Sequence, residues 1–170
     1  MNSGQRSPYL GSSLAAMSTE HDFDFFMGRW NVRGRRLRER LADCDEWLDI
    51  TAVAEAWPLL GGLGNVDTFE TDYGGGFHGA SIRFFHPQSK TWSIYWADSR
   101  TSGPLTAPVV GAFENGVGIF EADDTWDGVP IVCRYTWSRV ETASPRWEQA
   151  FSTDGGATWE TNWINDFTRE

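Results

Sequence analysis

The chain has 170 residues, a formal net charge of −10 and many large rings, with 10 Trp and 11 Phe. One domain is the expectation at this length. The acidic balance argues against nucleic acid or an anionic membrane as a partner, because both select for Lys and Arg. So many rings must be buried against one another or line a ligand pocket.

The N-terminal segment is rich in Ser and Gly, and its apolar run is too short for a secretory signal. We expect residues 1–20 to form a disordered tail and residues 21–170 to form the domain. The spacing of Cys44 and Cys133 matches no metal site. Two such thiols are typical of a cytoplasmic protein, with a disulfide between them as the alternative. No motif in the sequence predicts a metal or another cofactor.

Almost all of the chain after residue 28 consists of short segments typical of strands, separated by residues typical of turns. One helical turn is expected within EHDFDFFM, residues 20–27. Strands are expected at residues 29–39, 46–57, 66–71, 78–85, 91–98, 109–113, 116–122, 130–140, 146–152 and 159–169. Sequential antiparallel strands must protect their edges, and a closed up-and-down barrel does so completely. The predicted fold is an all-β closed antiparallel barrel of about ten strands, with a β-sandwich as the alternative.

The hairpin at residues 78–98 can be aligned by its alternation. Opposing Phe84 to Trp92 brings apolar side chains to one face. That face would carry Ala80, Ile82, Phe84, Trp92, Ile94 and Trp96. His78 and Asp98 then share its open end, where they would form either a general acid–base pair or a merely polar rim.

The C-terminal strands align in a similar way when Phe151 is opposed to Trp159. Gln149 then faces Thr161, and Trp147 faces Trp163. The preceding strand adds Tyr135, Trp137 and Arg139 to this face. A wall of indoles with a few polar groups is typical of a small-molecule cavity, whereas the alternative is that the Trp-rich strands simply pack together. The predicted ligand-binding residues are Ile82, Phe84, Trp92, Ile94, Trp96, Tyr135, Trp137, Trp147, Gln149, Phe151, Thr161 and Trp163.

The first strand is unusually rich in arginine. Its arginines, with those that follow it, are Arg29, Arg33, Arg35, Arg36, Arg38 and Arg40. Charge runs usually lie on a solvated face, although a single inward arginine could anchor an anionic ligand. The segment STDGGATW, residues 152–159, matches a sialidase Asp-box. A single copy in a short chain is interpreted as a hairpin turn, in which Asp154 bonds the backbone.

Gly28-Arg29-Trp30 after a helical turn resembles the G-x-W signature of lipocalin and calycin barrels. That resemblance implies that the Trp30 ring closes one end of the barrel and that Arg169 stacks on it. With IRFFHPQSKTWSIYWAD and WEQAFSTDGGATWETNWINDFTR, the chain is similar to a family of uncharacterised bacterial lipocalin-like proteins over residues 23–169. The family implies a barrel but supplies no catalytic residues.

These observations favour binding of a small hydrophobic or aromatic molecule inside the barrel. The first alternative is a small barrel enzyme, a cyclase or isomerase, that works in the same cavity. The second is an interaction module with a filled barrel. The sequence allows a homodimer but does not require one.

Overall fold

The computed structural model describes residues 17–101 and 103–170, which form short 3-10 helices and ten strands. The helical turns are η1 (Asp24–Phe26), η2 (Leu60–Gly62) and η3 (Tyr73–Gly75). The strands are β1 (Gly28–Leu37), β2 (Trp47–Leu59), β3 (Gly64–Thr71), β4 (Phe77–His86), β5 (Thr91–Asp98), β6 (Val109–Glu114), β7 (Val117–Trp126), β8 (Val129–Ser138), β9 (Arg146–Ser152) and β10 (Glu160–Arg169). The all-β prediction and the single turn before the first strand are confirmed.

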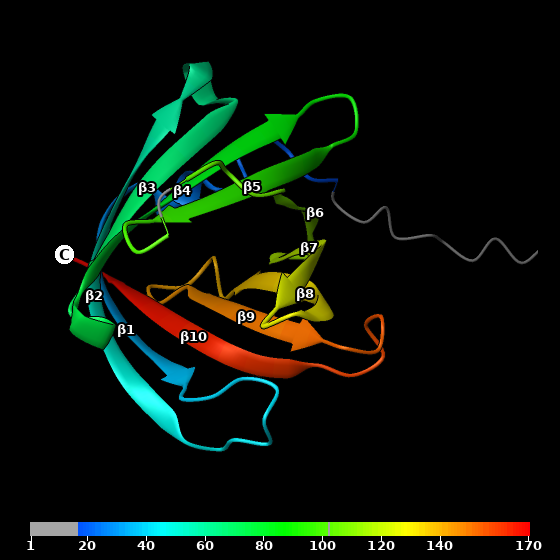
Figure 1. Ribbon diagram of the computed structural model, residues 1–170. Coiled ribbons are helices and arrows are strands. Elements are labelled where there is room, and N and C mark those ends of the chain that lie inside the picture. The colour runs from blue at the N-terminus through cyan, green and yellow to red at the C-terminus, as the bar shows by residue number, and fades with distance from the viewer. Residues whose placement is uncertain (1–16, 102) are drawn as a thin grey trace, which may run out of the picture.

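The strands close into one antiparallel barrel. Each strand pairs with its neighbours in the chain, and β1 also pairs with β10, so that no edge strand remains (Figure 1). The closed barrel is therefore confirmed over the sandwich. Within the described residues, no helix has the length and apolar character needed to cross a membrane.

The junction between β1 and β10 contains the contact predicted from the G-x-W resemblance. Trp30 and Arg169 are register partners, and the guanidinium carbon of Arg169 lies 3.9 Å from the centroid of the Trp30 ring. Arg169 also donates hydrogen bonds to the carbonyls of Phe25 and Met27. The indole Nε1 of Trp30 donates to the carbonyl of Phe26 at 2.7 Å. These bonds fix the entering helical turn against the last strand.

The segment before η1 is part of the packed fold. The side chain of Ser18 is buried and accepts a hydrogen bond from the backbone N–H of Phe113. The indole of Trp92 donates to the carbonyl of Thr19 at 3.2 Å. Of the predicted tail, residues 1–16 lie outside the described residues, and the domain begins before residue 21.

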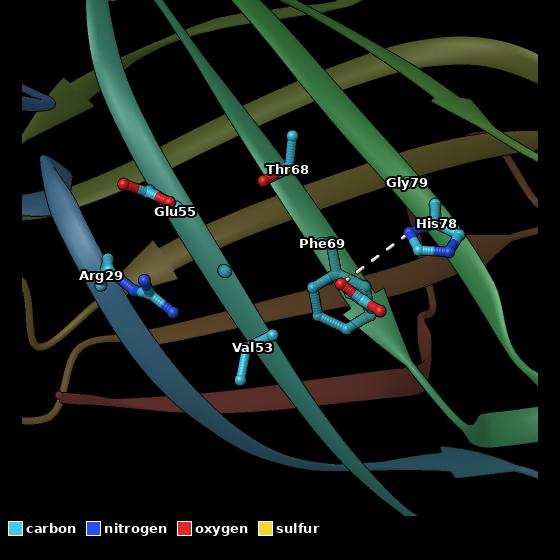
Figure 2. A pocket seen from close by; sticks show the side chains of 9 residues that line it. Arg29, Val53, Glu55, Thr68, Phe69, His78 and Gly79 are labelled. Atoms are coloured by element: carbon cyan, nitrogen blue, oxygen red, sulfur yellow. Dashed lines mark ion pairs between the residues drawn. The ribbon is translucent and has the colours of Figure 1, made fainter.

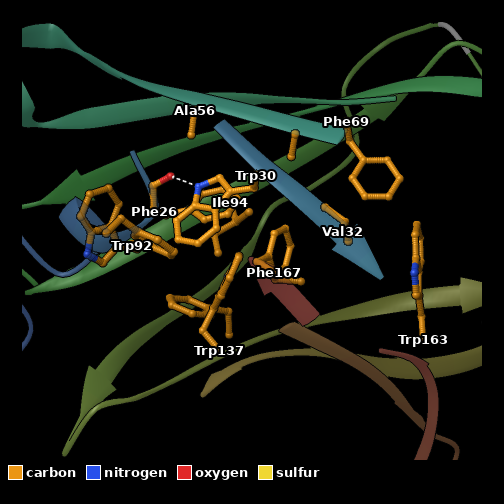
Figure 3. Packing of buried hydrophobic residues seen from close by; sticks show 14 of the residues in the cluster. Phe26, Trp30, Val32, Ala56, Phe69, Trp92, Ile94, Trp137, Trp163 and Phe167 are labelled. Atoms are coloured by element: carbon orange, nitrogen blue, oxygen red, sulfur yellow. Dashed lines mark hydrogen bonds between the residues drawn. The ribbon is translucent and has the colours of Figure 1, made fainter. Parts of the chain in front are cut away.

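One end of the barrel, here called the helix end, is filled by rings that surround η1. Phe23 lies with its ring centroid 5.0 Å from those of both Trp92 and Phe113. Figure 3 shows Phe26, Trp30, Trp92 and Trp137 gathered in this region. The helix-end cluster consists of Phe23, Phe26, Trp30, Trp92, Phe113, Phe120, Trp137 and Phe167, each of which is at most 8% exposed. This end is a packed core.

The register predicted for the β4–β5 hairpin is wrong by one residue. Trp92 pairs with Phe85, and Trp96 pairs with Ser81. Ile82 and Phe84 therefore lie on the outside of the barrel, where Phe84 contacts Tyr95. The inner face of β4 instead carries Phe77, Gly79, Ser81, Arg83 and Phe85. The predicted register was wrong because the outer face of β4 is more apolar than its inner face.

The register predicted for β9 and β10 is also wrong. Glu160, and not Trp159, pairs with Phe151, and a bulge between Thr161 and Trp163 shifts the rest of the strand. Thr161 pairs with Ala150 and so faces outward with it, whereas Gln149 faces inward. The expected inner position of Arg139 is wrong as well, because its side chain forms an ion pair at the surface with Asp166.

The turn between β9 and β10 has the structure predicted from its sequence. The carboxylate of Asp154 accepts hydrogen bonds from the backbone N–H and the hydroxyl of Thr158, at 2.9 and 2.6 Å. Gly155 and Gly156 have φ angles of 70° and 93°, which suit glycine. The Asp-box segment is thus a hairpin turn.

Candidate functional site

The opposite end of the barrel, here called the far end, carries a second group of rings. Neighbouring centroids in this group lie 5.0 to 6.3 Å apart. Figure 3 shows Phe69 and Trp163 apart from the rings around Trp30 and Trp137, with Val32 drawn between the two groups. The far-end cluster consists of Phe69, Phe77, Trp96, Tyr135, Trp147 and Trp163. It comes from strands β3, β4, β5, β8, β9 and β10.

The far-end cluster is less completely buried than the helix-end cluster. Trp96, Tyr135 and Trp147 belong to inward-facing strand positions yet remain only half-buried. Burial raises the pKa of the Tyr135 hydroxyl above its usual range. The inward side chains of the far end thus keep a solvent-accessible surface that the rings of the helix end do not.

The structure brings some of the predicted ligand-binding residues together and separates others. Trp96, Tyr135, Trp147 and Trp163 form the far-end cluster. The remaining residues that face inward are Trp92, Ile94, Trp137, Gln149 and Phe151. Of these, Trp92 and Trp137 belong to the packed helix end. Ile82, Phe84 and Thr161 face outward as described above.

His78 and Asp98 do not form an acid–base pair. His78 is exposed on the outside of the barrel, 4.0 Å from Glu70, whereas the side chain of Asp98 is only 7% exposed. Asp98 accepts a hydrogen bond from Nη2 of Arg100 at 2.8 Å, and another from the Arg100 backbone at 2.9 Å. The side-chain hydrogen bond from Arg100 is the main cause that lowers the pKa of Asp98 to about 2. Asp98 is therefore an ionised partner of Arg100 at neutral pH.

Two of the arginines named from the sequence, Arg36 and Arg40, lie at the far end, although neither was assigned there individually. Arg36, near the end of β1, is 9% exposed, and its guanidinium carbon lies 4.4 Å from the centroid of Trp163. Arg40 follows β1, and its guanidinium carbon lies 4.6 Å from the centroid of Trp126. The alternation that begins at Trp30 places Arg36 on the inner face. This alternation could have identified Arg36 as an inward residue. The run of arginines around it was instead interpreted as a solvated face.

Burial lowers the pKa of both arginines. For Arg36 the pKa falls to about 10, mainly because burial disfavours the charged form, with the positive charge of Arg40 as the next cause. For Arg40, burial is again the first cause. A lowered arginine pKa indicates a guanidinium whose charge its surroundings do not fully compensate.

The bulge in β10 adds a buried amide next to Trp163 in the chain. Asn162 is fully buried, and its Oδ1 accepts a hydrogen bond from Nε2 of Gln149 at 2.8 Å. Asn165 accepts from the indole of Trp163 at 3.0 Å. No local pattern around residue 162 signals the bulge, so Asn162 could not be assigned to the inner face from the sequence.

The connection between β1 and β2 folds against the far end. The backbone N–H of Leu41 donates to both carboxylate oxygens of Glu160, at 2.9 and 3.0 Å. The Leu41 side chain packs against a small core cluster that includes Ile131 and Phe151. Arg40 is held next to the barrel interior by this arrangement.

Two grooves lie on the outside of the barrel. The first, of about 280 Å³, runs over β1 to β4 and contains Arg29, Val53, Thr68 and His78 among its lining residues (Figure 2). The second lies beside it over β1 to β3 and shares Val53 with it. The side chain of His78 is 72% exposed, which is typical of a solvated surface and not of a built site.

No group of three or more potential metal ligands occurs in the part of the chain that the structure describes. A scan against protein-family models and a search of the curated proteins both return no match for this chain. The far end of the barrel is the candidate site on geometric grounds. It combines half-buried aromatic walls with buried polar groups, as small-molecule sites do.

Proposed function

We propose that the protein binds a small apolar or aromatic molecule in the far end of its barrel. The observation that carries this proposal is the accessible surface that remains on inward Trp96, Tyr135 and Trp147, while the helix-end rings are almost completely buried. Large flat side chains around a partly filled space favour a flat apolar ligand, because rings gain from stacked and edge-to-face contacts.

The chain architecture is consistent with this proposal. A barrel that is closed by a helical turn at one end and keeps accessible inward rings at the other resembles the lipocalin-like arrangement inferred from the sequence. The G-x-W segment and the stacking of Arg169 on Trp30 support that assignment. Cys44 and Cys133 are both free thiols, which supports a reducing, cytoplasmic setting.

A cavity-filling variant tests the proposal. Ala122 lies on the inner face of β7, opposite Cys133, and is half-buried. The variant Ala122→Phe puts a ring into the far end without removing any aromatic wall. Ile119→Phe is the matched control, because Ile119 is 44% exposed on the outer face of the same strand.

The probe is neutral naphthalene-2-carboxamide, measured by calorimetry and by quenching of Trp fluorescence. We expect the wild-type protein and Ile119→Phe to bind the probe with similar affinity, and Ala122→Phe to lose at least about tenfold, equivalent to roughly 1.4 kcal/mol. Thermal melts confirm that the variants are folded. Wild-type protein that fails to bind neutral aromatic probes, or Ala122→Phe that binds as well as wild type, would contradict the proposal and favour a filled barrel.

A further inference from the structure

We infer that the far end of the barrel selects a small aromatic acid, with Arg36 and Arg40 as the partners of its carboxylate. This inference deepens the proposed function and depends on it. The aromatic walls account for the ring system of such a ligand. The two arginines and the buried amide of Asn162 account for its charged group.

Arg36 is built into the wall of the site. It is the register partner of Trp163, and it lies over the ring of that residue at 4.4 Å. Trp163 in turn contacts Trp96 and Trp147, at centroid distances of 6.3 and 5.3 Å. The indole covers one face of the guanidinium and leaves its N–H edge for hydrogen bonds. A ligand ring against these indoles would have its substituents next to that edge.

The unsatisfied polar groups at the far end are all donors. Arg36 Nε, Arg40 Nε and Asn162 Nδ2 are buried and have no hydrogen-bond partner within the described residues. A buried donor without an acceptor is costly, and native proteins contain few of them. Three donors without an acceptor point to a ligand group that only accepts. A carboxylate is such a group, and its two oxygens match the planar fork of a guanidinium.

The arginines at the far end differ in whether they have a direct acidic partner. Arg100 is compensated by Asp98 at 2.8 Å. Arg36 and Arg40, in contrast, form no ion pair with any described residue; the arginines that do are Arg29, Arg38, Arg83, Arg100, Arg134, Arg139 and Arg146. The charges of Asp98 and Glu160 raise the pKa of Arg36 and Arg40, respectively, but neither acid forms an ion pair with these arginines. The carboxylate of Glu160 instead accepts from the backbone N–H of Leu41. A ligand carboxylate would supply the direct anionic partner that both guanidiniums lack among the described residues.

Three other arginines in or just after the first strand have partners at the surface. Arg29 pairs with Glu170, and Arg38 pairs with Glu46. Arg35 lies over the ring of Trp47 at 4.8 Å. Arg35 supplies a control on the same strand, one residue from Arg36 and on the opposite face.

The test compares two isosteric probes by calorimetry at neutral pH. Naphthalene-2-carboxylate and naphthalene-2-carboxamide share a ring system and differ in charge. We expect wild type to bind the carboxylate at least about tenfold more tightly than the carboxamide, since hydrogen bonds to a charged group are the stronger ones. Arg36→Met should abolish this preference, because it weakens carboxylate binding more than carboxamide binding. Arg40→Met should reduce the preference, and Arg35→Met should leave it unchanged.

Each outcome bears on a different part of the account. If wild type binds the carboxamide as tightly as the carboxylate, the acid preference is wrong while the aromatic site stands. If neither probe binds, the proposed function is wrong, and the acid preference that depends on it is wrong as well. If inorganic phosphate displaces the carboxylate with equal affinity, the site is a plain anion site and the aromatic acid is wrong. The wild-type ratio and its decrease with added salt require no variant, so the inference stays testable even if Arg36→Met does not fold.

Discussion

The buried ion pair between Arg83 and Asp67 permits the sharpest prediction about stability. The two side chains are 4% and 6% exposed, and their charged atoms lie 2.5 Å apart. Nη1 of Arg83 also donates to Oδ1 of Asn65 at 2.9 Å. The guanidinium carbon of Arg83 lies 5.0 Å from the ring centroid of Phe23 and 5.3 Å from that of Phe26. Arg83 thus ties the helical plug to the inner wall of the barrel.

Arg83→Met removes the charge but keeps most of the apolar stem. Removal of one partner from a buried pair costs about 3–5 kcal/mol, because the other charge is left without compensation. Here the group left behind is Asp67, whose pKa burial already raises against the lowering effect of Arg83. We expect Arg83→Met to lower the free energy of unfolding by an amount in this range at pH 7. In urea this corresponds to a midpoint lowered by about 2 M, at a slope near 2 kcal/mol/M.

The assay is urea unfolding followed by Trp fluorescence between pH 4.5 and 8. A group with a folded-state pKa above its unfolded value stabilises the fold at low pH, and this contribution is lost as pH rises toward the folded pKa. In Arg83→Met, the unpaired Asp67 should therefore make the loss smaller at pH 4.5 than at pH 8. Asp67→Asn combined with Arg83→Met should recover part of the stability. A loss below about 1 kcal/mol, or one that does not change with pH, would refute the reasoning.

Three further predictions concern separate parts of the barrel. Gly28→Ala should cost about 1–3 kcal/mol in urea unfolding, because Gly28 has a φ of 102° and a Cβ there would lie 2.8 Å from Nη1 of Arg169; an unchanged midpoint would contradict this. A disulfide reagent at pH 8 should modify Cys44 in the native protein but Cys133 only after unfolding, because burial raises the pKa of Cys133 to about 12; equal native rates would contradict this. Asp98 has its pKa lowered to about 2 by its arginine partner, so its stabilising effect is present above pH ~4 and lost as pH falls toward 2; a stability difference between wild type and Asp98→Asn that stays constant from pH 6 to 2 would contradict this.

The strands and their closure could be predicted because their signals are local. Alternating apolar residues define each strand, and turn residues separate one strand from the next. The Trp30–Arg169 contact followed from a short motif at one end of the chain and a single arginine at the other. The Asp154 turn was equally local, since its hydrogen bonds join residues four apart.

The inner face could not be assigned reliably, because a one-residue slip in register exchanges the two faces of a strand. β4 has Ile82 and Phe84 outside but Arg83 inside, where Asp67 compensates the charge. That compensation is made by another strand and is invisible in the hairpin itself. The bulge before Trp163 is likewise a property of the paired strands. Errors in the predicted site therefore arise where polar groups are buried with distant partners.

A crystal structure of the protein grown with naphthalene-2-carboxylate tests the central claim most directly. The account predicts the naphthalene rings against Trp147 and Trp163 in the far end of the barrel, with the carboxylate on Arg36. An interior completely filled by side chains, with the probe in the outer groove beside His78 or bound nowhere, would contradict it.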